Sequence, residues 1–389
     1  MPRGTVRKAL AALVVLAGGM ALAAGQASGT TTRGSTADSA RPPLVLAVEG
    51  PQTGPQASNG LDQLRGVELA VRQLDRAGGL WDGRRVVVYA ADDQADAAHA
   101  AAVALRVIGK GIHFLIGPYN SSVGLVNLPI YRRHHVLPVW MTSLPETAGL
   151  GATVQPMNPQ VSPIEAAYVE GTGAKHVAML VDESANGAFT EGMASRLQAA
   201  LARLGISATT TGLEEGRSES YYAQRVAGAL ATKPDLVYVS TYFPEGAKIA
   251  AALQAHGSRP GCLMGFANVD PGFLAATTRA QAQRCVFSGV PAASQMPSAA
   301  VYVHRYRAMF GKTPGVWGSF TYDSARILFR AINAAHSFNI FAIERQLRRT
   351  LNFAGATGPV TINRGNGYRT NVPLSILRVN DRDIFVIDR

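Results

Sequence analysis

The 389-residue chain is poor in the motifs that most often carry catalysis or bind cofactors. No strand-like run is followed by GxGxxG or GxxxxGK[ST], which excludes the glycine-rich phosphate loops. None of the eight histidines stands with a serine and an acid in a recognisable order. Asp92-Asp93 lacks a third ligand at metal-binding spacing. We therefore expect no cofactor, no metal and no enzymatic activity.

Long apolar runs are absent after residue 24. Before it, a basic segment with Arg3, Arg7 and Lys8 precedes 16 apolar residues, and residues 21–23 have the A-x-A form of a cleavage site. The run is shorter than the roughly 20 residues that span a bilayer. We predict a signal peptide over residues 1–27, with no lipid anchor through cysteine, and a flexible polar linker over residues 28–43.

Cysteine is nearly absent, and the two that occur are Cys262 and Cys285. Export would place them in an oxidising compartment, either the periplasm or the extracellular space and cell surface. An isolated pair in such a compartment usually forms a disulfide. We predict a Cys262–Cys285 bridge.

Basic residues outnumber acidic ones, 37 to 26, for a formal net charge of +11. They are scattered singly along the chain, and the longest basic run, residues 132–135, sits between a helix pattern and a strand pattern. A solvated helix end explains that run better than a nucleic-acid patch does. We expect no nucleic-acid partner.

Strand-like runs and amphipathic repeats alternate along residues 44–141 and again along residues 177–290. This alternation predicts an α/β fold with two doubly wound parallel-sheet lobes. Prolines 156, 159 and 163 interrupt the pattern between the two stretches. Helices are predicted over 298–310, 317–335 and 341–351, followed by a β-rich tail.

The stretch FLIGPYNSSVG, residues 114–124, raises the question of function. A buried strand ends at a Gly-Pro turn, and Ser121 and Ser122 follow where a helix begins. The serines could serve as a nucleophile, a phosphate cradle, a carboxylate grip or a plain N-cap. Free amides and the helix dipole make a helix start favourable for anions, and ligands of open α/β sheets bind at the carboxyl ends of strands. From these residues alone the plain N-cap is the simplest interpretation, and one serine can serve as both cap and carboxylate grip.

The segments VEGPQTGP, FLIGPYNSSVG, HVAMLVDESANG, DLVYVSTYFPEGAKIAAALQAHG, LMGFANVD and GATGPVTINRGNGYR occur in this order. Together they resemble type I periplasmic-binding proteins of the leucine/isoleucine/valine-binding kind, across nearly all of residues 44–388. The resemblance implies two lobes joined by a hinge of three crossovers. Lobe 1 would comprise residues 44–158 and 291–354, and lobe 2 residues 159–290 and 355–389.

The resemblance also implies a function. Such proteins capture a small solute between the lobes and deliver it to the permease of an ABC importer, so we expect a monomer that meets the membrane only through this partner. Two other classes remain open. One is an exported module that reports its ligand to a membrane receptor, and the other is an enzyme on the same fold.

The family's ligand-binding residues have counterparts at some positions of this chain and not at others. In the family, a serine of the Ser-Ser pair and a Thr or Ser after the fourth strand hold the ligand carboxylate, and an aromatic residue before Pro-Glu lines the second lobe. Two further aromatic positions hold asparagine here. The matching ligand-binding candidates are Ser121 with Ser122 beside it, Thr142 or Ser143, Tyr242, Asn59 and Asn186.

The family's acid for a ligand ammonium falls at Ala267 in this chain, and Asp270 is near but displaced. Asp270 therefore joins the candidates. An amino acid, an amide and a carboxylate without an ammonium all remain open as the solute.

Overall fold

The computed structural model describes residues 41–257 and 259–388. The predicted signal peptide, and the predicted linker as far as residue 40, lie outside the described residues. Among the described helices, none combines the length and the apolar composition needed to cross a bilayer.

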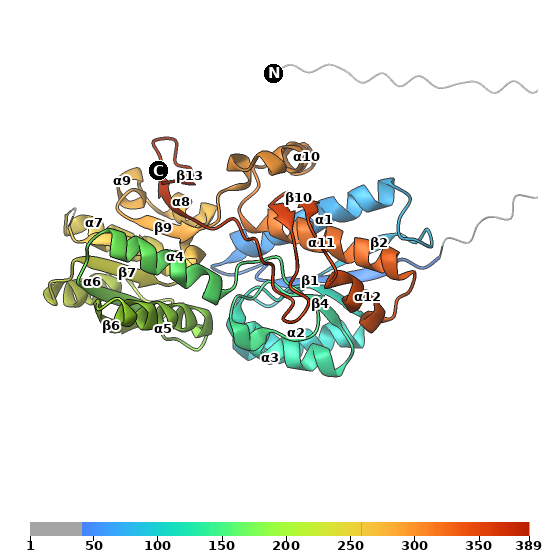
Figure 1. The fold of residues 1–389 in the computed structure, drawn as a ribbon, viewed down its shortest axis with the longest axis horizontal. Coiled ribbons are helices and arrows are strands. Elements are labelled where there is room, and N and C mark those ends of the chain that lie inside the picture. Colours follow the sequence, from blue (N-terminus) through green and yellow to red (C-terminus); the bar gives the residue numbers. More distant parts are fainter. Residues whose placement is uncertain (1–40, 258, 389) are drawn as a thin grey trace, which may run out of the picture. The chain divides into compact units, whose positions relative to one another are not determined.

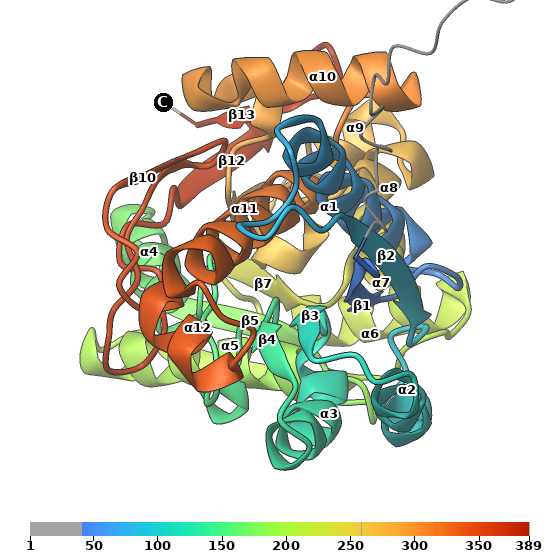
Figure 2. The ribbon, with the colours of Figure 1, turned by 90° about the vertical axis from the view of Figure 1, so that its right-hand side faces the viewer.

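The first of two main sheets has four strands in the order β2-β1-β3-β4, and every pair in it is parallel (Figure 1). Helices α1 and α11 cover one face, and α2 and α3 cover the other. Helix α10 packs on α1, and α12 packs on α11 (Figure 2). We call this sheet and these helices lobe 1. Its elements are β1 (Leu44–Gly50), α1 (Ala57–Arg76), β2 (Val86–Asp92), α2 (Ala97–Gly109), β3 (Phe114–Ile116), α3 (Ser121–Arg133), β4 (Leu137–Val139), α10 (Ala300–Phe310), α11 (Trp317–Ala335) and α12 (Ile340–Leu347).

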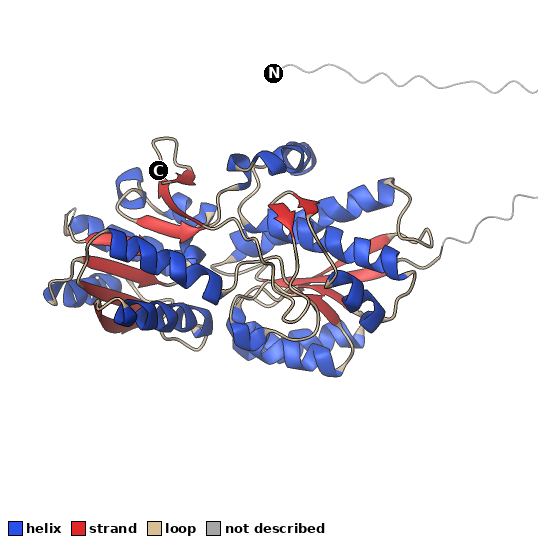
Figure 3. Ribbon diagram, viewed as in Figure 1, coloured by secondary structure: helices blue, strands red, loops and turns tan. Residues whose placement is uncertain are grey.

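The second main sheet has seven strands in the order β13-β12-β9-β8-β7-β5-β6 (Figure 3). Helices α4 and α5 pack on one face, and α6 and α7 on the other. We call this sheet and helices α4 to α9 lobe 2. Its elements are α4 (Asn158–Gly171), β5 (His176–Asp182), α5 (Ala188–Arg203), β6 (Ser207–Leu213), α6 (Glu219–Ala231), β7 (Leu236–Ser240), α7 (Phe243–Ala255), β8 (Gly261–Met264), α8 (Pro271–Ala276), α9 (Arg279–Ala282), β9 (Val286–Gly289), β12 (Ser375–Val379) and β13 (Phe385–Ile387).

Strand β5 shows why the sheets take helices on both faces. Val177, Met179 and Val181 pack with α4 and α5, whereas Ala178 and Leu180 belong to the core on the opposite face. Successive side chains of a strand point to opposite faces, so a run that is apolar throughout needs both faces covered. The predicted α/β class with two parallel-sheet lobes is confirmed.

The β-rich tail departs from the parallel pattern. Strand β12 pairs antiparallel with β9, and β13 pairs antiparallel with β12. A short hairpin of β10 (Phe353–Gly355) and β11 (Gly358–Val360) precedes them and forms a sheet of its own. The tail strands therefore extend the lobe 2 sheet, while the residue boundaries proposed for the lobes stay a prediction.

The interruption predicted around the three prolines is wrong at two of them. Helix α4 begins at Asn158, with Pro159 in its first turn and Pro163 inside it. The first-turn amides of a helix have no internal acceptor, so Pro159 removes no hydrogen bond there. The short helices α8 and α9 and the strand β10 were also not predicted.

The predicted disulfide is present. It joins Cys262 on β8 to Cys285, which directly precedes β9. Because β8 and β9 are neighbours in the lobe 2 sheet, the bridge ties together two strands that already pair.

A buried network holds the segment that follows the β10 strand. Asp323 on α11 accepts hydrogen bonds from the backbone amides of Ala356 (2.8 Å) and Thr357 (2.9 Å) and from the Thr357 hydroxyl (2.7 Å). Arg369, also buried, donates to the Thr357 hydroxyl and carbonyl. The chain is thus anchored to α11 shortly before it enters the lobe 2 sheet.

Glu165 on α4 provides a test of the lobe 2 core. Its Oε1 accepts from the hydroxyls of Ser288 on β9 (2.6 Å) and Tyr238 on β7 (3.2 Å). Burial raises the pKa of this carboxyl to about 7. The folded protein therefore binds the Glu165 proton more tightly than the unfolded chain does. The protonated carboxyl contributes fully to the free energy of unfolding below about pH 4.5, and this contribution is lost as the pH rises through 7.

We predict that Glu165→Gln, which keeps the size and one acceptor, removes this pH dependence. Between pH 4.5 and 8 the free energy of unfolding of the wild type should fall relative to the variant by about 3 kcal/mol. Urea unfolding at several pH values measures the difference. Parallel curves for the two proteins would contradict the assignment.

Candidate functional site

Loops from both lobes meet at one small cavity, which we call the interlobe cavity. It lies at the carboxyl ends of β3, β4, β5, β7 and β8, the edge where open α/β sheets bind ligands. The space for the centre of a water molecule is about 10 Å³, enough for one water. The lining residues are Tyr119, Ser121, Ser143, Gln155, Phe189, Tyr242, Phe266 and Ala267.

Ser121 is the first residue of α3, and its hydroxyl has a specific task. The N-cap position belongs to Asn120, whose side chain makes no capping bond. Ser121 Oγ instead accepts hydrogen bonds from the backbone amides of Ser143 and Leu144, both at 3.3 Å. A hydroxyl has two lone pairs and one hydrogen. Both lone pairs are therefore used, and what Ser121 can offer the cavity is its hydrogen.

Ser143 is arranged in the same way. Its hydroxyl accepts from Nε2 of Gln155 at 2.7 Å, and within the described part of the chain neither Ser121 nor Ser143 donates to a protein acceptor. Oε1 of Gln155 is buried without a partner among the described residues. The polar end of the cavity thus presents two hydroxyl donors and one neutral amide oxygen.

Thr142 and Ser143 differ in whether their hydroxyls can donate a hydrogen bond into the cavity. The Thr142 hydroxyl lies 2.6 Å from that of Thr147, which itself donates to the Leu144 carbonyl at 2.6 Å. Thr142 is therefore the donor to Thr147, and its hydroxyl hydrogen is already used in a hydrogen bond within the loop. Only Ser143 lines the cavity.

Aromatic rings form most of the remaining wall. The ring centroids of Phe189 and Tyr242 are 5.7 Å apart, and those of Phe189 and Phe266 are 5.0 Å apart in an edge-to-face contact. Phe266 in turn contacts Trp317 on α11, which also contacts Tyr119. A continuous series of ring contacts therefore runs from lobe 2 to lobe 1.

The structure places five other candidates away from the cavity lining. Asn186 bridges the lobes, since its Oδ1 accepts from the amide of Ala97 at 3.0 Å. Asp270 also bridges them, because its Oδ1 accepts from the Ser58 hydroxyl at 2.9 Å, and burial raises its pKa to about 6. The others are Thr142, and Asn59 and Ser122, which are buried and whose side chains have no partner among the described residues.

Ser121, Ser143 and Tyr242 are thus brought together, and whether they contact a solute stays a prediction. Sequence reasoning missed Tyr119, Gln155, Phe189 and Phe266 as lining residues. Tyr119 and Phe266 lie in strand exits, which is a usable signal. Gln155 lies in the proline-rich segment before α4, where no pattern marks it.

Charge is absent from the lining, which contains no Asp, Glu, Lys, Arg or His. In the described residues, no group of three His, Cys, Asp or Glu side chains is placed to hold a metal ion. The arrangement can therefore hold a small molecule by hydrogen bonds and ring contacts.

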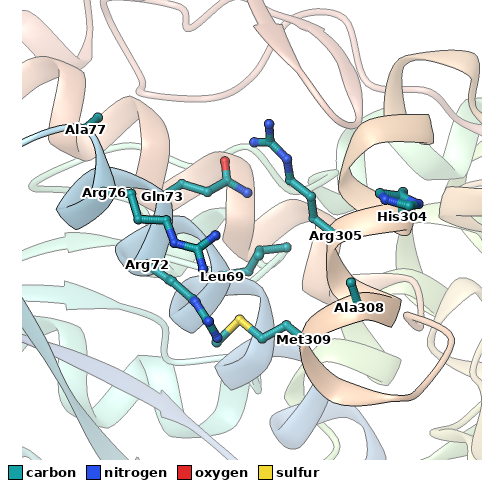
Figure 4. Close-up of a pocket in the computed structure, with 9 residues that line it drawn as sticks. All are labelled: Leu69, Arg72, Gln73, Arg76, Ala77, His304, Arg305, Ala308 and Met309. Carbon is teal, nitrogen blue, oxygen red and sulfur yellow. The ribbon is translucent and has the colours of Figure 1, made fainter.

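A different hollow, of about 460 Å³, lies between α1 and α10 (Figure 4). The guanidinium groups of Arg72, Arg76 and Arg305 reach into it above Leu69 and Met309. All of its lining residues belong to lobe 1. Movement of the lobes against each other would not enclose a solute there, so the interlobe cavity is the better candidate.

The two lobes share a cavity at the carboxyl ends of their strands, where open α/β sheets bind small molecules. Residues 43–383 match the model of the periplasmic binding protein family, and the chain belongs to that family. The resemblance to leucine/isoleucine/valine-binding proteins is confirmed.

Three known proteins illustrate the likeness. The Leu/Ile/Val-binding protein BraC3 of Rhizobium johnstonii is 28% identical over 216 residues, which are 54% of this chain and 58% of BraC3. The leucine-binding protein LivK of Thermotoga maritima superimposes with a TM-score of 0.80 at 23% identity, over 88% of this chain and 97% of LivK. A solute-binding protein of an ABC transporter from Rhodopseudomonas palustris BisB5, in complex with 3,4-dihydroxybenzoic acid, gives 0.77 at 18% identity, over 89% and 96%. The chain thus spans well under two thirds of BraC3, and the two structures show the fold.

Adjacent serines allow a test of the geometry. Ser121→Ala removes the acceptor of two buried amides and should lower the free energy of unfolding by about 1–3 kcal/mol. Ser122→Ala, the matched control, removes a buried hydroxyl without a described partner and should leave stability nearly unchanged. Urea unfolding of the three proteins measures both effects. Equal stabilities of the two variants would show that Ser121 does not hold the loop after β4.

Proposed function

We propose that this chain is an exported solute-binding protein that captures a small polar solute between its lobes and delivers it to an ABC importer. The observation that carries the proposal is the interlobe cavity itself, lined from both lobes by hydroxyl donors and aromatic rings. Small-molecule sites are mostly apolar with a few placed polar groups, which is the composition found here. The predicted signal peptide supports export.

The same lining supports a proposal of binding without reaction. General acid–base catalysis needs a titratable group within hydrogen-bond reach of the reacting atom. The lining holds no carboxyl, imidazole or amine, and burial raises the pKa of its two phenols, Tyr119 and Tyr242, so the proposal is that the solute leaves unchanged.

The fold alone does not determine which solute binds. LivK is named for leucine, whereas the Rhodopseudomonas protein holds a carboxylic acid without an amino group. We keep amino acids, amides and carboxylates as the classes to screen, with Ser121 and Ser143 as the groups that receive the solute's oxygen atoms.

Calorimetry with a panel of these solutes tests the proposal. A binding solute should be recovered chemically unchanged. Ser121→Ala should weaken its affinity by about 1–3 kcal/mol, because a charge-assisted hydrogen bond is lost, whereas Thr142→Ala should have little effect. Failure of every amino acid, amide and carboxylate to bind would refute the proposal, as would turnover of the bound solute.

A further inference from the structure

We propose that the solute is a small aromatic carboxylate without an amino group, bound with its carboxylate on Ser121 and Ser143 and its ring among Phe189, Tyr242 and Phe266. This inference rests on the proposed function and narrows its solute class. It depends on three features of the cavity, namely the polarity of its serine end, the packing of its rings and the absence of charge.

The hydroxyls of Ser121 and Ser143 are arranged to donate hydrogen bonds into the cavity. Both lone pairs of Ser121 Oγ are occupied by backbone amides, and Ser143 Oγ already accepts from Gln155, so each hydroxyl has a hydrogen left to give. Ser121 also begins a 13-residue helix, whose first amides have no internal acceptor and whose positive end favours anions. A carboxylate has only acceptor sites and matches these donors.

The aromatic wall favours a flat group. The ring of Phe189 contacts those of Tyr242 and Phe266, with centroids 5.7 and 5.0 Å away, and the cavity must widen to admit any solute. A planar ring requires a separation of only about one carbon–carbon contact, 3.5–4.0 Å, on each face. It would also restore edge-to-face or offset contacts to the rings it parts. A branched or saturated group is thicker and restores none.

An ammonium group has no acid to meet. Ala267 lines the cavity, whereas Asp270, three residues on, does not, and its Oδ1 is held by Ser58 and the Gly272 amide. Oε1 of Gln155 is one neutral acceptor, whereas an ammonium carries three hydrogens. The ammonium of an amino acid would meet one neutral acceptor here, whereas a carboxylate meets two hydroxyl donors and the positive end of α3.

A quaternary ammonium is the remaining rival, since aromatic rings attract such cations through their faces. A cage for such a cation needs rings set apart around a void. Here Phe189 meets Phe266 edge to face and at contact distance, with room for one water in the whole cavity. The rings therefore touch one another and do not surround the space that a cage for a cation needs.

Two matched pairs of probes test the inference by calorimetry on the purified protein. Benzoate against cyclohexanecarboxylate isolates planarity, and 3-phenylpropanoate against phenylalanine isolates the amino group. We expect the first member of each pair to bind about tenfold tighter or more, which corresponds to about 1.4 kcal/mol. Leucine and glycine betaine complete the panel. Tighter binding of cyclohexanecarboxylate, phenylalanine, leucine or betaine would overturn the inference and leave the proposed function standing.

Substitutions in the aromatic wall test where the ring of the bound carboxylate lies. Phe266→Leu should weaken benzoate about tenfold and change cyclohexanecarboxylate by less than about twofold, because only the aromatic contact is lost. Phe189→Leu tests the same wall if the first variant does not fold. Ser122→Ala, outside the cavity, should bind as the wild type does. Unchanged benzoate affinity in the folded Phe variants would overturn the placement. If none of the panel binds and no amino acid or amide does either, the proposed function itself fails.

Discussion

One hydrogen-bonding arrangement sets the character of this site. The hydroxyl of Ser121 accepts from two consecutive backbone amides of the loop after β4 and so joins that loop to the start of α3. Its lone pairs are then used, and only a hydrogen remains to face the cavity. Ser143, held by Gln155, and the positive end of α3 have the same polarity. The serine side of the cavity therefore presents two hydroxyl donors, with Oε1 of Gln155 as one acceptor beside them.

The opposite wall is apolar and comes mainly from lobe 2. Phe189, Tyr242 and Phe266 follow three parallel strands, and their contacts reach Trp317 on α11. Such a site works only if the two walls are held by separate, well-packed lobes. Each sheet is covered on both faces, and buried anchors such as the bonds between Asp323 and Thr357 hold the chain where it passes toward the lobe 2 sheet.

Much of the fold could be predicted from the sequence, because its strands are continuous apolar runs and its helices have clear amphipathic periods. Strand β3 ends directly before the Gly-Pro turn and helix α3 begins at Ser121, as predicted. Helix α4 was missed because proline at a helix start costs no hydrogen bond, and composition alone does not show this. The candidate site was only half predictable. Strand exits correctly indicated where polar groups gather, but Asn186 and Asp270 bond the opposite lobe instead of lining the cavity. Which of two neighbouring hydroxyls is spent internally, as with Thr142 and Ser143, depends on contacts that only the folded chain defines.

In the proposed function, both lobes hold one solute at the same time. Small-angle X-ray scattering of the purified protein, alone and with a solute found to bind, tests it most directly. Because the lobes must open to admit a solute and then close around it, we expect a smaller radius of gyration with the solute bound than in the free protein. A solute that calorimetry shows does not bind should cause no change. An unchanged radius of gyration at saturating concentrations of the bound solute would contradict it.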